Sequence, residues 1–185
     1  MYPTETFYGL GADATSPRAL ECLFAAKHRE PGKPVGLIVA DLAMARQVAA
    51  EIPANALRLA VSFWPGPLTM VLPARAELDP ALIGSDGGVG LRVSPNPIAH
   101  ALVRRFGRPL TATSANLAGE PPAETLEQAR ESFGDKVAIY LDGGKLGQMP
   151  ASTVITFEHG TPRVLRQGPI SEGQIAAALR DETVS

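Results

Sequence analysis

Short apolar runs alternate with helix-start signals along most of this chain, and that alternation limits the folds open to it. The run at residues 35–39 is followed by Asp41, a helix N-cap, and the run at 89–93 is followed by Asn96-Pro97, which opens another helix. Runs this short, placed between helices, are typical of strands buried in a sheet. We therefore predict an α/β fold with a twisted, mixed parallel and antiparallel sheet flanked by helices.

Capping residues, turn residues and hydrophobic periodicity predict where the elements lie. Helices are predicted at 17–27, 41–52, 55–63, 97–107, 125–134 and from 171 onward, and strands at 35–39, 68–72, 89–93, 110–113, 137–141, 152–157 and 162–166. With 185 residues, of which 45% are hydrophobic, the chain is long and apolar enough to bury one sizeable core. We expect a single domain over residues 1–185.

Composition excludes several classes of protein. The 17 Lys and Arg residues against 19 Asp and Glu give a net charge of −2, so no global positive field draws the chain onto nucleic acid or an anionic membrane. The apolar runs are far shorter than the ~20 residues of a membrane span. The single cysteine, Cys22, cannot form an internal disulfide, and the chain opens without a signal-peptide pattern. We expect a cytoplasmic protein without a membrane anchor, in which Cys22 packs on the inner side of its helix.

Motifs for metal binding and for a serine nucleophile are absent from the sequence. His28, His100 and His159 stand apart, with no pair at metal-ligand spacing, so we expect no metal held by protein side chains. The chain has no P-loop and no dinucleotide fingerprint, and Ser114 lacks the flanking glycines of a nucleophile elbow. Covalent serine catalysis is therefore not expected.

Polar residues gather just after the predicted strand at 110–113. Ser114 and Asn116 lie on a loop there, and open α/β sheets bind ligands outside the carboxyl ends of their strands. Serine and asparagine are also common turn formers. The segment alone leaves a ligand site and a capped turn equally open.

Basic residues form a second feature. Lys27, Arg29 and Lys33 precede the strand at 35–39, and either an anionic ligand or a solvated surface would account for them. Arg92 differs, because it lies inside an apolar strand, where a lone guanidinium is strongly unfavourable unless it is paired or faces a cavity. Arg166 repeats this pattern at the end of a later apolar run.

Several motifs occur together and in order along the chain. They are Tyr2-Pro3-Thr4-Glu5-Thr6-Phe7-Tyr8-Gly9-Leu10-Gly11, Lys27-x-Arg29-x-x-x-Lys33-Pro34, Phe63-Trp64-Pro65-Gly66-Pro67-Leu68-Thr69, Val89-Gly90-Leu91-Arg92, Ser114-Ala115-Asn116-Leu117-x-Gly119, Ser152-Thr153-Val154 and Arg166-x-Gly168. Each motif alone is weakly specific, but the combination resembles the YrdC-like family of bacterial threonylcarbamoyl-AMP synthases. The resemblance runs from Tyr2 to about Gly168.

The resemblance implies a fold with a large concave cavity and an enzyme, a nucleotidyltransferase. Such an enzyme joins L-threonine, bicarbonate and ATP into threonylcarbamoyl-AMP and releases pyrophosphate, and the product serves the modification of the tRNA adenosine beside the anticodon. ATP is thus implied as a substrate, with Mg²⁺ bound through its phosphates. The threonylcarbamoyl transferase complex that modifies the tRNA is implied as a partner.

The resemblance also implies positions for the two substrates. By position, ATP contacts fall on Lys27, Arg29, Lys33, Gly88, Ser114, Asn116, Pro122 and Arg166, and threonine contacts fall on Thr6, Arg92, Ala112 and Ser152. The basic residues suit a triphosphate, and an arginine facing a cavity suits a carboxylate. Catalysis is expected to rest on positioning and charge neutralisation by Lys27, Arg29, Ser114 and Asn116.

The chain departs from the family pattern at two places and agrees with its short form at the C-terminus. Members usually have a strand and a short helix before the Tyr-Pro-Thr motif, whereas Met1 directly precedes it here, so we expect an N-terminal strand to be missing. Many longer relatives carry a histidine where this chain has Ile38, which predicts a less polar threonine pocket. The sequence ends at Ser185 without an extension, as in the short form.

Two other functions remain open on sequence grounds. One is a binding module for tRNA or double-stranded RNA without synthase activity, against which the net charge of −2 argues mildly. The other is a related enzyme that carries out the same carbamoylation and adenylation on an acceptor other than threonine.

Overall fold

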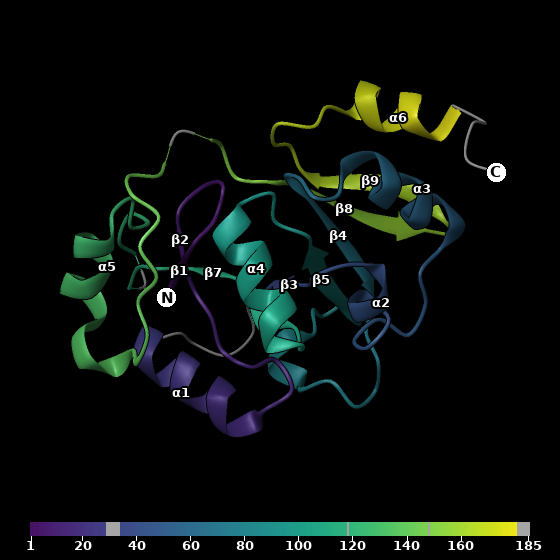
Figure 1. Ribbon diagram of the computed structural model, residues 1–185. Coiled ribbons are helices and arrows are strands. Elements are labelled where there is room, and N and C mark those ends of the chain that lie inside the picture. The colour runs from purple at the N-terminus through teal and green to yellow at the C-terminus, as the bar shows by residue number, and fades with distance from the viewer. Residues whose placement is uncertain (29–33, 118, 148, 181–185) are drawn as a thin grey trace.

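The computed structural model describes residues 1–28, 34–117, 119–147 and 149–180 of the 185-residue chain (Figure 1). The helices are α1 (Pro17–Lys27), α2 (Leu42–Ala45), α3 (Ala54–Phe63), α4 (Pro97–Phe106), α5 (Leu126–Phe133) and α6 (Glu172–Arg180). The strands are β1 (Tyr2–Pro3), β2 (Tyr8–Leu10), β3 (Leu37–Ile38), β4 (Leu68–Pro73), β5 (Gly88–Arg92), β6 (Leu110–Thr111), β7 (Thr113–Ser114), β8 (Thr153–Glu158) and β9 (Thr161–Arg166).

The strands form two sheets. The larger has the order β6-β3-β5-β4-β8-β9, in which β3 pairs with β5 and β4 with β8 in parallel while the other pairs are antiparallel. The smaller, β1-β2-β7, is antiparallel throughout. The prediction of an α/β fold with a mixed sheet is confirmed.

The two sheets are joined where the predicted strand 110–113 divides. Leu110–Thr111 pairs with β3 in the large sheet, and Thr113–Ser114 pairs with β2 in the small sheet. Between them, the Ala112 amide still donates to the carbonyl oxygen of Gly36, at 2.7 Å. A single residue therefore carries the chain from one sheet to the other.

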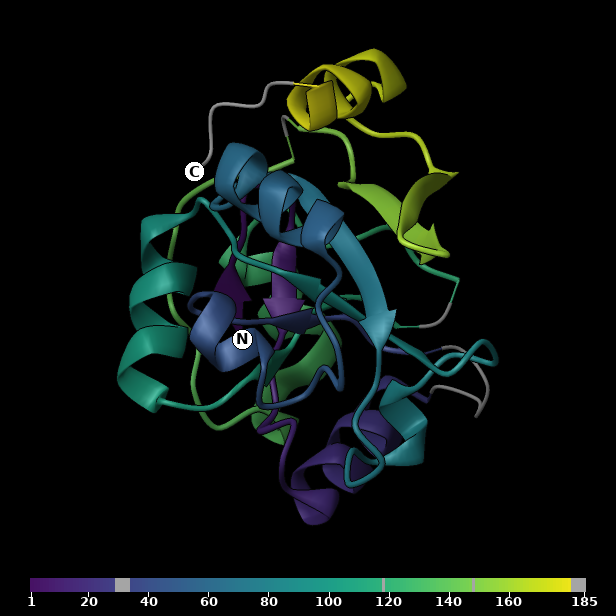
Figure 2. The same cartoon turned by 90° about the vertical axis from the view of Figure 1, so that its right-hand side faces the viewer.

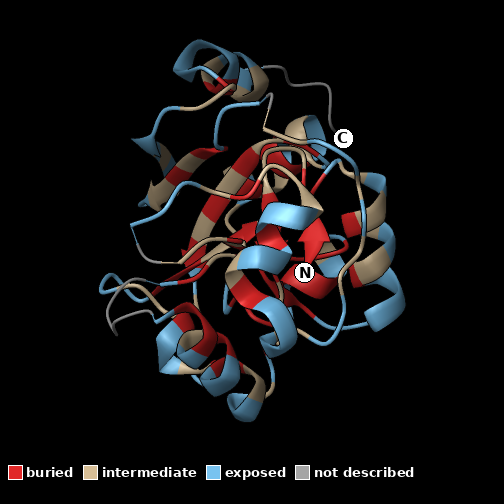
Figure 3. Cartoon of the chain, turned by 90° about the vertical axis from the view of Figure 1, so that its left-hand side faces the viewer, coloured by how far each residue is buried: buried red, intermediate tan, exposed pale blue. Residues whose placement is uncertain are grey.

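Helices pack on both sheets and bury their apolar sides (Figure 3). At one end of the large sheet, α3 packs against α6 and β9 (Figure 2). One buried cluster surrounds the large sheet, and a second one joins the small sheet to α1 and α5 through Tyr8, Leu23 and Phe133. Two cores thus flank the junction of the sheets.

The predicted helix signals form as expected. Ser16 accepts the Ala19 amide, Asn96 accepts two amides at the start of α4, and Thr125 makes the complete capping box with Gln128. Gly107 ends α4 with a φ of 74°, a left-handed conformation that glycine adopts without strain.

Two predicted elements are wrong. The helix predicted over 41–52 ends at Ala45, because the next residues pair with the end of β4: the Ala50 amide donates to Pro73 at 2.8 Å. Residues 137–141 form no strand. Among the described residues, the one distant partner of their backbone is Met1, which donates to the Ile139 carbonyl oxygen and accepts the Leu141 amide. A single paired residue cannot extend a ladder.

The prediction for Cys22 is also wrong. Its thiol is exposed, while its neighbour Leu23 is buried, so the apolar side of α1 passes beside Cys22 and not through it.

The described part of the chain offers neither a membrane-spanning helix nor a metal-binding cluster of side chains. None of its helices combines the length and apolarity that a membrane span requires. In those same residues, no group of three or more His, Cys, Asp or Glu side chains is arranged to hold a metal ion.

Candidate active site

A cavity of about 750 Å³ lies where the two sheets meet. Its wall includes Thr6 and Ser114 from the small sheet and its turns, and Thr69, Arg92 and Arg166 from the large sheet. The size is in the range of pockets that hold small molecules and cofactors.

Glycines leave part of the cavity wall without side chains. Gly36 and Gly90 lie opposite each other on neighbouring chain segments and both line the cavity. A Cβ atom added at Gly90 would meet only the Thr69 methyl group at 3.5 Å and the Gly36 Cα atom at 3.8 Å, which are ordinary contacts. The space above this pair is therefore open to a ligand.

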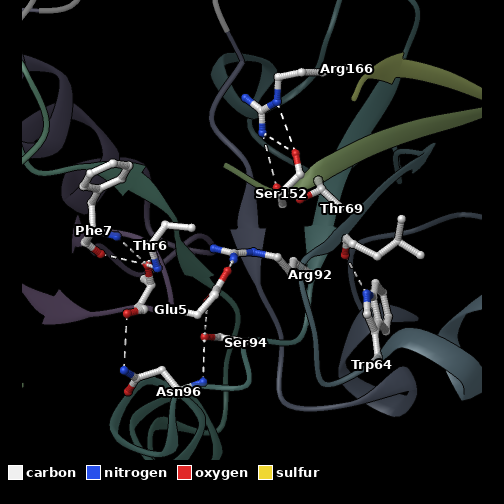
Figure 4. A network of polar contacts seen from close by, with 12 residues as sticks. Glu5, Thr6, Phe7, Trp64, Thr69, Arg92, Ser94, Asn96, Ser152 and Arg166 are labelled. Carbon is white, nitrogen blue, oxygen red and sulfur yellow. Dashed lines mark hydrogen bonds and ion pairs between the residues drawn. The ribbon is translucent and has the colours of Figure 1, made fainter. Parts of the chain in front are cut away.

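Arg92 ends β5, and its side chain, only 11% exposed, lines the cavity. Its Nη1 atom forms an ion pair with the Oε1 atom of Glu5, whose side chain is 8% exposed (Figure 4). Burial lowers the pKa of the Arg92 guanidinium, the nearby Tyr2 phenol opposes this shift, and the positive charge of Arg166 adds to it. The guanidinium that the sequence singled out is thus both paired and facing a cavity.

A tight turn places Thr6 at the cavity. The Thr4 hydroxyl donates to the Phe7 carbonyl oxygen at 2.7 Å and accepts the Thr6 amide at 3.2 Å. The hydroxyl groups of Thr4 and Thr6 lie 3.1 Å apart, and both residues line the cavity. These bonds fix the Thr6 side chain beside Arg92 (Figure 4).

A second guanidinium, that of Arg166, faces the same cavity from β9. It donates through Nη2 to the carbonyl oxygen of Ser152 at 2.9 Å and to the Ser152 hydroxyl at 3.3 Å. That hydroxyl lies 2.8 Å from the Thr69 hydroxyl. Within the described residues, no carboxylate lies at ion-pair distance from Arg166, so its charge is available to an anionic ligand.

The residues after β7 form a closely bonded turn. The Ser114 hydroxyl donates to the Oδ1 atom of Asn116, whose Nδ2 group donates to the carbonyl oxygens of Leu117 and Glu120. Lys27 is buried at the end of α1, and its ammonium donates to the Ser114 carbonyl oxygen. Ser114 lines the cavity, whereas Asn116 and Lys27 hold it from behind.

Eight of the sequence-predicted site residues line this one cavity: Thr6, Gly88, Arg92, Ala112, Ser114, Pro122, Ser152 and Arg166. Lys27 and Asn116 adjoin it through Ser114, and Arg29 and Lys33 lie outside the described residues. Ile38 is buried in the core and does not line the cavity, so it does not make the pocket wall less polar. The individual substrate roles of these residues stay predictions.

Sequence reasoning missed Glu5 and Ser94. Ser94 donates to the second carboxylate oxygen of Glu5 at 2.8 Å, across 89 residues of chain. The buried charge of Arg92 was a signal that an acid was needed, but no spacing rule identifies a partner so distant in sequence.

Comparisons with known proteins show which family the chain resembles in sequence. The Sua5/YciO/YrdC family model, described as telomere recombination, matches residues 1–168. A Mycobacterium tuberculosis protein is 40% identical over all 185 residues, which cover 85% of its length. A threonylcarbamoyl-AMP synthase of Serratia proteamaculans is 37% identical over 90% of this chain and 88% of its own length.

A solved structure shows that the similarity extends to the fold. Pyrococcus abyssi Sua5, crystallised with L-threonine, superimposes with a TM-score of 0.88 and 35% identity over 96% of this chain. The chain spans about half the length of that protein, 52%. By its sequence and its fold, this chain belongs to the Sua5/YciO/YrdC family.

Proposed function

We propose that this protein is a threonylcarbamoyl-AMP synthase, which converts L-threonine, bicarbonate and ATP into threonylcarbamoyl-AMP and pyrophosphate. The observation that carries the proposal is the convergence of eight predicted substrate contacts, from segments far apart in sequence, on one cavity. The synthase names of relatives and the threonine complex of Pyrococcus abyssi Sua5 support it. The alternative of an RNA-binding module gains no support from these relatives.

Threonine is assigned to the part of the cavity beside Arg92. A guanidinium binds a carboxylate through parallel N–H groups, and Thr6 and Ser152 supply hydroxyl groups on either side. Ala112 adds a small apolar surface at the junction of the sheets. This arrangement suits an amino acid with a short hydroxylated side chain.

ATP is assigned to the part that includes Ser114, Pro122, Gly88 and Arg166. Arg166 neutralises phosphate charge, and Lys27 fixes the backbone that carries Ser114. Arg29 and Lys33 complete the ATP assignment on the basis of sequence alone.

The chemistry then requires no protein nucleophile. The neutral threonine amine attacks the carbon of bicarbonate, which loses water, or of carbon dioxide, in which case the amine releases a proton; both routes give a carbamate. A carbamate oxygen then attacks the α-phosphorus of ATP and expels pyrophosphate. The protein contributes by holding the two substrates in line and by stabilising negative charge as it moves to pyrophosphate.

Metal and partner assignments follow from the substrate. ATP enters as its magnesium complex, in which phosphate oxygens are the natural Mg²⁺ ligands. Among the described residues that line the cavity, Asp86 is the one carboxylate, and one of its oxygens already accepts the Gly88 amide at 3.0 Å. The product is expected to pass to the complex that modifies tRNA.

Pyrophosphate release tests the proposal. The full chain, given ATP with each amino acid in turn, should release pyrophosphate with L-threonine and far less with the other amino acids, and removal of bicarbonate should abolish the signal. Release that is independent of threonine, or of bicarbonate, contradicts the proposed function.

A further inference from the structure

Glu5 lies next to the cavity but does not line it. Its chain neighbours Thr4 and Thr6 do, and so does its ion-pair partner Arg92. The Glu5 side chain is 8% exposed and meets the Nη1 atom of Arg92 (Figure 4). Any effect of this carboxylate on a ligand therefore passes through the Arg92 guanidinium.

A second contact holds the Glu5 carboxylate. Ser94, which is completely buried, donates its hydroxyl proton to Oε2 at 2.8 Å and accepts the Asn96 amide at 3.2 Å. The two carboxylate oxygens are thus bound by different residues, one by Arg92 and one by Ser94. A carboxylate held at both oxygens has little freedom to rotate.

The backbone that carries Glu5 is also fixed. The Nδ2 group of Asn96 donates to the Thr4 carbonyl oxygen at 3.3 Å, and the Oδ1 atom of the same side chain accepts the amides of Ile98 and Ala99. Asn96 therefore ties the Glu5 turn to the first turn of α4. The Glu5 position depends on the packing of a helix as well as on a loop.

The charge arrangement calls for a carboxylate at this place. Arg92 and Arg166 face one cavity, and the charge of Arg166 disfavours the charged form of Arg92. In the part of the chain that the structure describes, Glu5 is the one carboxylate paired with either guanidinium. Without it, burial and the positive charge of Arg166 would both act against a charged Arg92 guanidinium at this position.

We propose that Glu5 is a positioning residue, which with Ser94 fixes the Arg92 guanidinium so that its remaining N–H groups present one geometry to a ligand carboxylate. The inference rests on the proposed function for the identity of that ligand, L-threonine. The pairing uses Nη1 and leaves the N–H groups on the other nitrogens for the cavity. Groups that orient a metal ligand typically contribute about 10- to 100-fold in affinity, and an orienting carboxylate behind an arginine acts by the same principle.

The first test reads the Arg92 side chain itself. Nitrogen NMR of the full chain should give resolved guanidinium signals for Arg92, assigned by their loss in Arg92→Lys, because the ion pair slows rotation of the group. Glu5→Gln should average these signals, and Ser94→Ala should do so in part. Unchanged Arg92 signals in both variants overturn the proposal, and Ser94→Ala alone decides if Glu5→Gln does not fold.

The second test reads ligand affinity. Glu5→Gln should raise the dissociation constant for L-threonine by about tenfold and leave that for ATP within about twofold, since ATP does not depend on Arg92. L-threonine amide, which has no carboxylate, should bind both proteins alike. Glu158 forms an exposed ion pair with Arg163, at 2.6 Å. Glu158→Gln is therefore the matched control: it makes the same chemical change at an exposed ion pair and should change neither affinity.

The two tests separate this inference from the proposed function. If the unmodified protein binds no threonine, the proposed function fails, while the NMR comparison still decides the role of Glu5. If the unmodified protein binds threonine and Glu5→Gln binds it equally or more tightly, the positioning role is wrong and the function stands.

Discussion

Replacement of Arg92 by leucine should both destabilise the protein and abolish threonine binding. Leucine fills much of the space of the arginine side chain, but it leaves the Glu5 carboxylate buried without its cation. Removal of one partner of a buried ion pair is destabilising by about 3–5 kcal/mol, and the retained Ser94 bond places this case near about 3 kcal/mol. For a chain of this length that corresponds to a melting temperature lower by about 6–12 °C.

The double variant Glu5→Leu/Arg92→Leu separates charge from packing. It removes both charges, so its unfolding free energy should return to within about 1–2 kcal/mol of the unmodified protein. Threonine binding should stay absent, because Arg92, the cation assigned to the threonine carboxylate, is gone. Thermal melts and calorimetric titrations with threonine and ATP on the same preparations measure both quantities. An Arg92→Leu protein that melts like the unmodified one, or a double variant no more stable than the single, would refute the buried ion pair as described.

Three further predictions follow from the cavity and its surroundings. Gly90→Leu places a side chain into open cavity space, so it should abolish substrate binding in titrations without lowering the melting temperature, whereas Gly90→Ala should bind more weakly but measurably. Asn116→Ala removes three side-chain hydrogen bonds of its turn and should lower the unfolding free energy by about 1–3 kcal/mol, whereas Ser114→Ala should mainly lower turnover. If Asn116→Ala lowered turnover and left stability unchanged, Asn116 would not be a turn residue. Burial raises the pKa of the Tyr2 hydroxyl, so the folded protein holds this proton more tightly than the unfolded chain does, and the free energy of unfolding should fall as the pH rises above about 10. Urea titrations at several pH values should show that Tyr2→Phe makes this fall less steep; an equally steep fall in the variant would contradict the role of Tyr2.

Local signals predicted most of the elements, and long-range pairing explains those that failed. The caps at Ser16, Asn96 and Thr125 act within three residues of their helices and formed as predicted. The helix predicted beyond Ala45 does not form, because the chain there pairs with the end of β4, which is distant in sequence: the Ala50 amide donates to Pro73, and the Val48 carbonyl oxygen accepts the Arg75 amide. The division of strand 110–113 likewise depends on two different partner strands, which its own residues do not encode.

The candidate site divides in the same way. Arg92 was recognisable because a charged residue in an apolar strand is unfavourable without a partner or a cavity. Its partner was not recognisable, because Glu5 lies far from Arg92 in sequence and only the fold brings the two side chains together. The sequence left the role of Asn116 open between a ligand contact and a turn former, and its hydrogen bonds to Leu117 and Glu120 favour the turn. Short-range chemistry was readable from sequence, whereas contacts between distant segments required the fold.

Identification of the adenylated product tests the central claim most directly. The full chain would be incubated with ATP, L-threonine and ¹³C-labelled bicarbonate. The nucleotide products would then be separated and their masses determined by mass spectrometry. A threonylcarbamoyl-AMP product that carries one ¹³C atom from bicarbonate is the result that the account predicts. An adenylate of threonine without the labelled carbon, or no adenylate at all, would contradict it.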